Sequence, residues 1–201
     1  MTCGNKLSVN KSISGRIAAA LAVLLCLLML TGCRSMNGAE KKVSKELEAL
    51  RGSDSVGSEV INLRESLSDE GKEHFDGFLK KLKGFDFEIT GSEEVRENDD
   101  EYTIVNVKIK TYDFGREYLA AWTGYLKANE DQKPAEMTDF YELLFAGLNS
   151  LDEKEYIKTI NIVCIDPLDN GEWIANIKEN EELQDAVFGG MMSEMKTLAA
   201  E

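Results

Sequence analysis

The sequence predicts an α+β domain, with an antiparallel sheet of about four strands packed on helices. Three observations predict this class. Apolar residues recur at helical spacing over 40–50 and 68–84, the spacing changes to every second residue over 85–112 and 155–177, and helical patterns return between and after these stretches. Strands joined by short turns form antiparallel hairpins. Helices segregated onto one face of such a sheet make an α+β domain.

The residues before the first strand predict two helices with a weaker helical stretch between them. The segment 40–50 places its apolar residues on one face: Val43, Leu47 and Leu50. Glycines and serines over 51–58 end this helix, and 60–63 form a poorly defined helical stretch. A clearer helix covers 68–84 and ends at a glycine. Its apolar face consists of Phe75, Phe78, Leu79 and Leu82.

The strand patterns predict two hairpins. The first joins 85–95 to 102–112 through the acidic turn "ENDD", and the second joins 155–165 to 172–177 through the turn "DPLDNG". In the second strand the core-facing residues alternate with polar ones: Val105, Val107, Ile109 and Thr111. This alternation predicts a sheet with one wet face.

Helices are predicted between the hairpins and after the last strand. Two helical segments, 113–129 and 135–151, form an insertion, and the second has an apolar face of Phe140, Leu143, Leu144 and Leu148. A C-terminal helix over 181–198 is capped by Asn180 and has an apolar face of Leu183, Val187, Met191, Met195 and Leu198. Gly189-Gly190 inside it cost about 1 kcal/mol each against alanine, so we expect a kink or close backbone packing there.

Three segments carry a resemblance to a known group of proteins. They are "LKKLKGFDFEI", "YTIVNVKIKTYDFGREY" and "YIKTINIVCIDPLDNGEWIANIKENEELQDAVFGGM", preceded by two helices. Together they resemble small bacterial lipoproteins of unknown function in the cystatin-like, nuclear-transport-factor-2-like superfamily, over residues 60–195. The resemblance implies a strongly curved sheet wrapped around helices, with a cone-shaped cavity. The insertion and the C-terminal helix depart from the smallest members, and either could fill that cavity.

The first 32 residues have the composition of an export signal. Three basic residues precede an unbroken apolar stretch over 17–30, and the first 32 residues include no acidic one. These 14 residues match the core of a signal peptide, whereas a helix that spans a bilayer needs about 20. A short transmembrane anchor is the alternative.

The motif "LTGC", which ends at Cys33, resembles the lipobox of bacterial lipoproteins. The resemblance implies cleavage between Gly32 and Cys33 and a diacylglyceryl group on the Cys33 sulfur. Two acyl chains anchor a protein stably where one does not. We therefore expect 33–39 to be a lipidated tether and 40–201 a single extracytoplasmic domain. It would sit at the outer face of the cytoplasmic membrane, or in the outer membrane if the source has one.

Cysteines and charge limit the chemistry of the mature chain. Cys3 and Cys26 leave with the signal and Cys33 is alkylated, so Cys164 remains as a single thiol, predicted to be buried. His74 is the single histidine, so no zinc set can form. The formal charge of −14 becomes −17 once the three signal bases are removed. Such a surface repels nucleic acid and anionic lipid headgroups, so we predict no nucleic-acid binding and a domain that stands off the membrane.

The sequence offers no convincing catalytic or metal site. The candidates for proton transfer inside a superfamily-type cavity are His74, Asp86, Glu88, Asp113 and Glu117. Asp86 and Glu88 alternate with phenylalanines and should face water, and no nucleophile–base–orienter set is visible. The triplet "DFG" at 113–115 indicates a strand-to-helix turn, with Asp113 as the cap and the phenylalanine packed on the sheet. Both acidic turns lack calcium-loop spacing, so we predict no metal or cofactor.

Two apolar segments are candidate binding surfaces. One helical face of the insertion gathers the aromatic residues Phe114, Tyr118, Trp122 and Tyr125. We expect the first three to point toward the concave face of the sheet, together with Val107 and Ile109, either as packing or as a cleft wall. The second candidate is an adaptable docking face of Met191, Met192 and Met195, with core packing as the alternative.

These patterns leave three functions open. The first is a lipid-anchored binding or accessory module without catalytic activity, which offers an apolar cleft or docking face to a small apolar ligand or an envelope protein. The second is an acid–base enzyme that uses a carboxylate in the cavity. The third is a structural subunit of an envelope complex, docked through the glycine–methionine segment. A deep pocket with a buried carboxylate would favour the second, and a closed core with exposed methionines the third.

Overall fold

The computed structural model describes residues 36–53, 58–97, 100–128 and 137–200. The chain divides into two compact units, and the second, Asn37–Glu201, contains every element described below. The predictions for the export signal and for Cys33 lie outside the described residues. Among the helices that are described, none is both long and apolar enough to cross a membrane.

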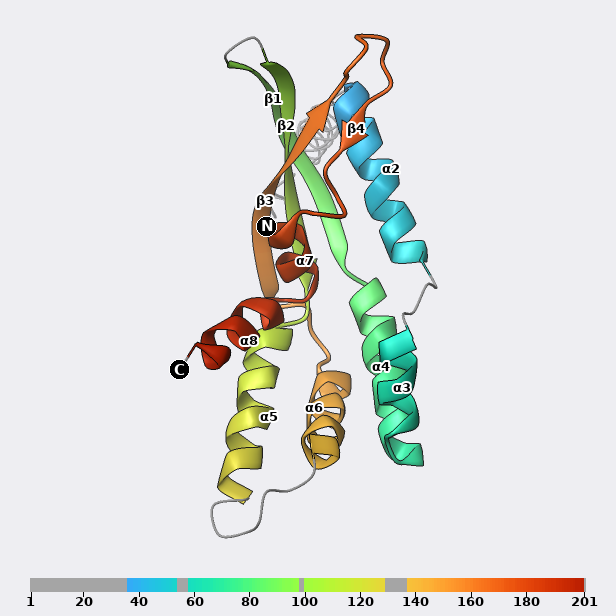
Figure 1. The fold of residues 1–201 in the computed structure, drawn as a ribbon, viewed down its shortest axis with the longest axis vertical. Helices are drawn as coiled ribbons and strands as arrows, with labels where there is room; N and C mark the ends of the chain where they lie inside the picture. The colour runs from blue at the N-terminus through green and yellow to red at the C-terminus, as the bar shows by residue number, and fades with distance from the viewer. Residues whose placement is uncertain (1–35, 54–57, 98–99, 129–136, 201) are drawn as a thin grey trace, which may run out of the picture. The chain divides into compact units, whose positions relative to one another are not determined.

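The described chain is an α+β domain with seven helices and an open, four-stranded antiparallel sheet. The strands follow one another in the order β1-β2-β3-β4 (Figure 1). Their bounds are β1 Asp86–Glu97, β2 Asp100–Thr111, β3 Tyr156–Ile165 and β4 Ile174–Ala175. The two predicted hairpins are confirmed, but β4 has two residues in place of the predicted 172–177.

Helices α2 (Gly38–Gly52) and α7 (Glu181–Val187) cover one face of the sheet (Figure 1). The core-facing residues of β2 and β3 are buried there: Val105, Val107, Ile109, Thr111, Ile160, Ile162 and Cys164. Burial raises the pKa of the Cys164 thiol to about 11. The prediction that Cys164 is a buried thiol is confirmed.

Helix α2 begins at Gly38, two residues before its predicted start. Asn37 caps it, because the Asn37 side chain accepts a hydrogen bond from the Glu40 amide at 2.8 Å and the Glu40 carboxylate accepts one from the Asn37 amide at 3.0 Å. Ser92 of β1 hydrogen bonds to both side chains, at 2.9 Å and 2.8 Å. The last two residues of the predicted tether 33–39 therefore belong to a helix that is fixed to the sheet.

A second group of helices lies beyond the end of the sheet (Figure 1). They are α3 Ser58–Glu65, α4 Asp69–Lys83, α5 Phe114–Ala128, α6 Met137–Ser150 and α8 Met191–Ala199. Both α4 and α5 pack against α6, and their side chains form a second core, separate from the core under the sheet.

The insertion does not lie in the concave face of the sheet, so this prediction was wrong. Phe114, Tyr118 and Trp122 belong to the second core, whereas Val107 and Ile109 belong to the core under α2 and α7. Helix α5 begins at Phe114, directly after β2 ends at Thr111, and it packs on α6 and α8 instead of on the sheet.

The predicted C-terminal helix is two helices with a sharp corner between them. Gly189 and Gly190 adopt φ values of 53° and 81°, which are left-handed conformations that glycine tolerates. The Gly189 carbonyl accepts a hydrogen bond from the Gly115 amide at 3.0 Å. The expected kink and the expected close packing of backbones both occur here. Across the corner, the Asp185 carboxylate accepts a hydrogen bond from the Ser193 amide at 2.9 Å and thereby caps α8.

Candidate apolar binding groove

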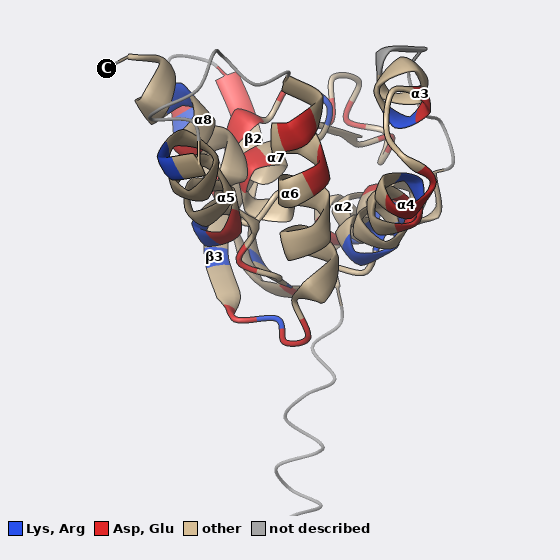
Figure 2. Cartoon of the chain, turned by 90° about the horizontal axis from the view of Figure 1, so that it is seen from below, with Lys and Arg blue, Asp and Glu red and all other residues tan. Residues whose placement is uncertain are grey.

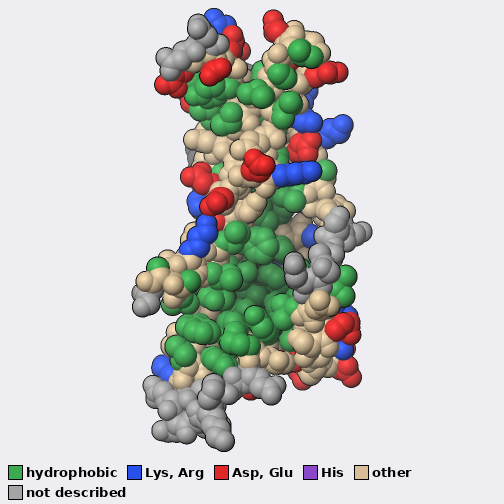
Figure 3. Space-filling view, viewed as in Figure 1, with side chains coloured by type: hydrophobic (Ala, Val, Ile, Leu, Met, Phe, Trp, Pro, Cys, Tyr) green, Lys and Arg blue, Asp and Glu red, His purple; other side chains and the backbone are tan. Residues whose placement is uncertain are grey.

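An open apolar groove of about 640 Å³ lies among the helices beyond the sheet. Figure 3 shows it as a hollow lined by hydrophobic side chains, with α3 and α4 on one side and α5 and α8 on the other. Helix α6 lies between α4 and α5, and its lining residues other than the exposed Met137 form the floor. Residues from these helices and from the neighbouring ends of α2 and α7 line the groove: Leu50, Ser53, Val60, Leu63, Phe75, Phe78, Leu79, Leu82, Lys83, Phe85, Tyr118, Trp122, Met137, Phe140, Tyr141, Leu144, Phe145, Leu148, Val187, Phe188, Met191 and Met195.

Aromatic packing sets the shape of the floor. Phe140 of α6 is only 2% exposed, and three aromatic rings of α5 pack edge-on against it. The ring centroids lie 5.8 Å away for Tyr118, 5.3 Å for Trp122 and 5.7 Å for Tyr125. Edge-to-face pairs at these distances are favourable beyond the area that they bury. The floor is therefore preformed by contacts within the protein.

The predicted aromatic face of α5 divides between core and groove. Phe114 is fully buried, with its ring 5.3 Å from that of Phe78. Tyr118 and Trp122 are half-buried and line the groove, whereas Tyr125 packs behind Trp122 outside the lining. The alternative of a cleft wall thus fits Tyr118 and Trp122, in a groove between helices and not in a cone under the sheet.

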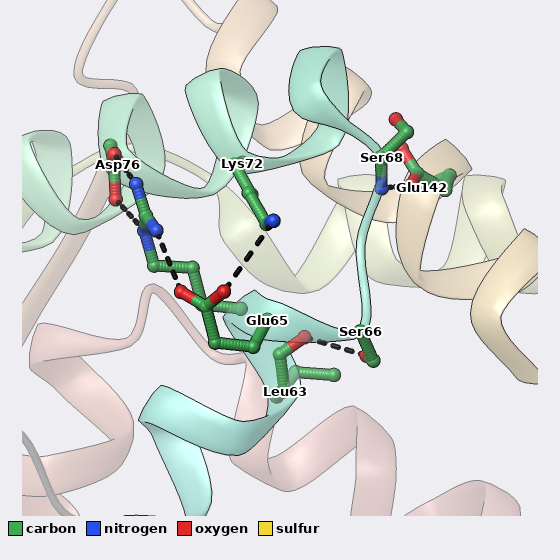
Figure 4. A network of polar contacts seen from close by, with 8 residues as sticks. Leu63, Glu65, Ser66, Ser68, Lys72, Asp76 and Glu142 are labelled. Carbon is green, nitrogen blue, oxygen red and sulfur yellow. Dashed lines mark hydrogen bonds and ion pairs between the residues drawn. The ribbon is translucent and has the colours of Figure 1, made fainter.

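Polar contacts hold α3, the outermost wall, against α4 (Figure 4). The guanidinium of Arg64 pairs with both oxygens of Asp76 at 2.8 Å and with Glu65 at 3.1 Å, and Lys72 lies 3.5 Å from Glu65. The Arg64 hydrogen bonds hold the pKa of Asp76 below its usual value. These groups are largely solvent-exposed, so each pair contributes little stability. Their effect is mainly to orient α3, which carries the lining residue Leu63.

The glycine corner positions the opposite wall. Helix α8 has no buried residue, and it presents Met191 and Met195 to the groove. Met192, the third residue of the predicted docking face, is half-buried and lies outside the lining. The prediction of a methionine docking face therefore fits two of its three residues. The alternative of core packing fits Met191, which packs against the second core, but not Met195, which is 46% exposed.

Among the described residues, those that line the groove include no carboxylate and no histidine. Its polar side chains are Ser53, Lys83, Tyr118 and Tyr141, and burial raises the pKa of the Tyr118 phenol. Each of the five proton-transfer candidates lies elsewhere in the described chain. This lining favours the binding of hydrocarbon over proton transfer.

The five candidates have other surroundings. Asp86 and Glu88 are exposed as predicted, and Asp86 pairs with Lys154 at 2.8 Å. Asp113 caps α5 by accepting a hydrogen bond from the Arg116 amide at 3.0 Å, as predicted. Glu117 lies on α5 and His74 is half-buried on α4.

The acidic turns form no metal site in the described part of the chain. No group of three or more potential ligands was found among the described residues. In the turn after β3, the Asp166 carboxylate accepts hydrogen bonds from the Asn170 and Gly171 amides at 3.2 Å and 2.6 Å. This carboxylate therefore organises a turn, as predicted. The centre of the other turn, residues 98–99, lies outside the described residues.

No family model, no curated protein and no solved structure matches the chain. The resemblance to cystatin-like lipoproteins therefore stays a prediction.

Sequence reasoning missed the contribution of α3 and of the second face of α6. Val60 and Leu63 belong to the stretch that was predicted as poorly defined, and Met137 and Tyr141 flank the predicted face of α6. Leu143, predicted to lie on the apolar face, is 46% exposed. The one available signal was that α6 has more apolar residues than a single packed face requires.

Proposed function

We propose that this chain is a lipid-anchored extracytoplasmic binding module without catalytic activity, whose groove holds an apolar group of a ligand. The observation that carries the proposal is the open groove of about 640 Å³ with its almost entirely apolar lining. Binding cavities typically measure about 300–1,000 Å³ and have few polar groups. The export signal and the motif at Cys33 support the anchor and the extracytoplasmic location.

An unoccupied groove leaves apolar side chains in water. Met137 and Met195 at its rim are 48% and 46% exposed. Covering such side chains gains about 0.8 kcal/mol per buried methylene. Methionine side chains adapt to differently shaped partners because they are flexible and polarizable. Rigid aromatic rings on the floor and adaptable methionines at the rim suit a binding role.

The other two functions have weaker support. An acid–base enzyme needs a carboxylate at its site, and the part of the lining that the structure describes has none. A structural subunit that docks through α8 would explain why Met195 is exposed. Met195 also lines the groove, however, so a binding groove explains its exposure equally well. The cystatin-like assignment is part of this proposal, supported by a sheet covered on one face by α2.

A dye titration tests the groove. The soluble chain from Ser35 onward would be titrated with 1-anilinonaphthalene-8-sulfonate, which fluoresces in apolar sites. We expect saturable binding that Met195→Glu weakens about tenfold, because a carboxylate in an apolar site is poorly solvated. Met192→Glu is the matched control on the same helix, outside the lining, and should bind like the wild type. Equal losses in the two variants, or no saturable binding, would refute the proposal.

A further inference from the structure

We infer that the occupant of the groove is an amphipathic helix of a partner polypeptide, with a basic polar face. This inference rests on the proposed function, and it names the class of ligand. Three observations carry it: a vacant helix position between α4 and α5, the place where the chain leaves the domain toward Cys33, and the net negative charge of the chain.

The groove has the geometry of a helix bundle that lacks one helix. In Figure 1, α4 and α5 run alongside each other with α6 between and behind them. Both pack on α6, and all three direct aromatic or aliphatic side chains into the groove. Packed helices lie about 8–10 Å apart, so a helix laid over α6 would contact α4 and α5 together. Four-helix bundles bury their apolar faces in this way.

The polarity of the lining favours a helix over an extended peptide. The lining of 22 residues includes four with polar side chains. An extended backbone in such a groove would leave amides and carbonyls without partners, and each costs free energy when buried. A helix satisfies these groups internally and presents an apolar stripe at i, i+3, i+4 and i+7, as groove-bound helices do.

The position of the anchor argues against a bilayer lipid as the occupant. Helix α2 has 15 residues, which span about 22 Å. Its start at Asn37 is four residues from Cys33, a reach of about 14 Å, whereas its last turn contributes Leu50 to the groove. The groove therefore lies at the other end of α2 from the point where the chain continues toward Cys33. The mature charge of −17 opposes lying flat on an anionic membrane.

The net charge of the chain sets the polar face of the partner. Locally the charges are mixed: Asp139 near the start of α6 is exposed, Glu65 on α3 pairs with Arg64 and Lys72, and Lys83 belongs to the described lining. Figure 2 shows the acidic residues in red and the basic residues in blue on the helices. The whole chain carries −14. A helix whose outward face carries lysines or arginines is attracted to this surface, and one that carries glutamates is repelled.

A displacement experiment separates the occupants. The groove dye bound to the soluble chain would be displaced by a synthetic Leu/Lys helix of about 18 residues, long enough to be helical when bound. The comparison ligands are a scrambled peptide of the same composition, a Leu/Glu peptide with the same apolar stripe, and lauric acid. The soluble chain is appropriate because both cores lie within the unit that begins at Asn37.

We expect the Leu/Lys helix to displace the dye, to gain helical circular dichroism on binding, and to bind Met195→Glu about tenfold more weakly than Met192→Glu. The scrambled peptide should fail. Displacement by lauric acid and not by the helix would overturn this inference while leaving the proposed function intact. Equal displacement by the Leu/Glu peptide would overturn the basic face. A dye that never binds would instead refute the proposed function.

Discussion

Replacing Gly189 with alanine tests whether the backbone crossing at the glycine corner positions α8. Gly189 has a φ of 53°, and a Cβ atom added there would lie 2.0 Å from the carbonyl oxygen of Tyr112. Gly171 offers a matched control, since its φ is 83° and a Cβ atom there would meet nothing within 4 Å. Both variants carry the same kind of backbone strain, but only Gly189→Ala adds a clash with backbone.

The expected losses of stability differ accordingly. A non-glycine residue in a left-handed conformation costs about 1–2 kcal/mol, which is the whole effect at Gly171. At Gly189 the clash forces the two backbones apart, which adds about 1–3 kcal/mol. Loss of the hydrogen bond from the Gly115 amide, 3.0 Å long, adds about 1 kcal/mol. We expect Gly189→Ala to destabilise the domain by about 3–6 kcal/mol.

Urea denaturation of the soluble chain, followed by circular dichroism, gives both free energies of unfolding. Dye binding by the folded variants reports on the groove. Gly189→Ala should weaken dye binding because Met191 and Met195 move with α8, and Gly171→Ala should leave it unchanged. If the two variants lose the same stability within about 0.5 kcal/mol, the corner does not position α8 as described.

Three further predictions concern the groove floor, the cap of α8 and the anchor. Trp122→Ala should cost about 1–2 kcal/mol in urea denaturation, because its half-buried ring lines an open groove. Phe140→Ala, 2% exposed, should cost about 3–5 kcal/mol, and equal losses would contradict the open groove. Burial alone would raise the pKa of Asp185, but hydrogen bonds from the Ser193 amide and Lys158 outweigh it and lower the pKa. Asp185 therefore contributes stability above its unfolded pKa, near 4, and this is lost as pH falls through the lower folded value. Asp185→Asn should lose about 1–3 kcal/mol at pH 7, and an undiminished difference at pH 2 would contradict this assignment. Cys33→Ser should abolish lipidation, and mass spectrometry that finds a free Cys33 thiol in the native protein would refute the anchor.

The sheet was predictable because strand periodicity reports directly on burial. The side chains of Val105, Val107 and Ile109 alternate with polar ones, so they all lie on one face of the sheet. That face must be the one that is buried. The kink at Gly189-Gly190 was predictable for a similar reason, since two adjacent glycines disfavour a continuous helix.

The groove was not predictable because the apolar face of a helix does not indicate which element it packs against. Tyr118 and Trp122 lie one helical turn apart and so share one face of α5. This spacing is the same whether the face packs against a sheet or against α6. In the structure α5 packs on α6 and α8. Periodicity identifies the apolar face of a helix but not the element that covers it.

Quenching of the two tryptophans tests the central claim, an open apolar groove, most directly. The chain has two tryptophans, and both are half-buried, Trp122 in the groove and Trp173 against Gly38 at the start of α2. The variants Trp173→Phe and Trp122→Phe each leave one reporter, and trichloroethanol serves as a small apolar quencher. The groove predicts saturable quenching of Trp122 and only collisional, non-saturating quenching of Trp173. Identical, non-saturating quenching of both tryptophans would contradict it.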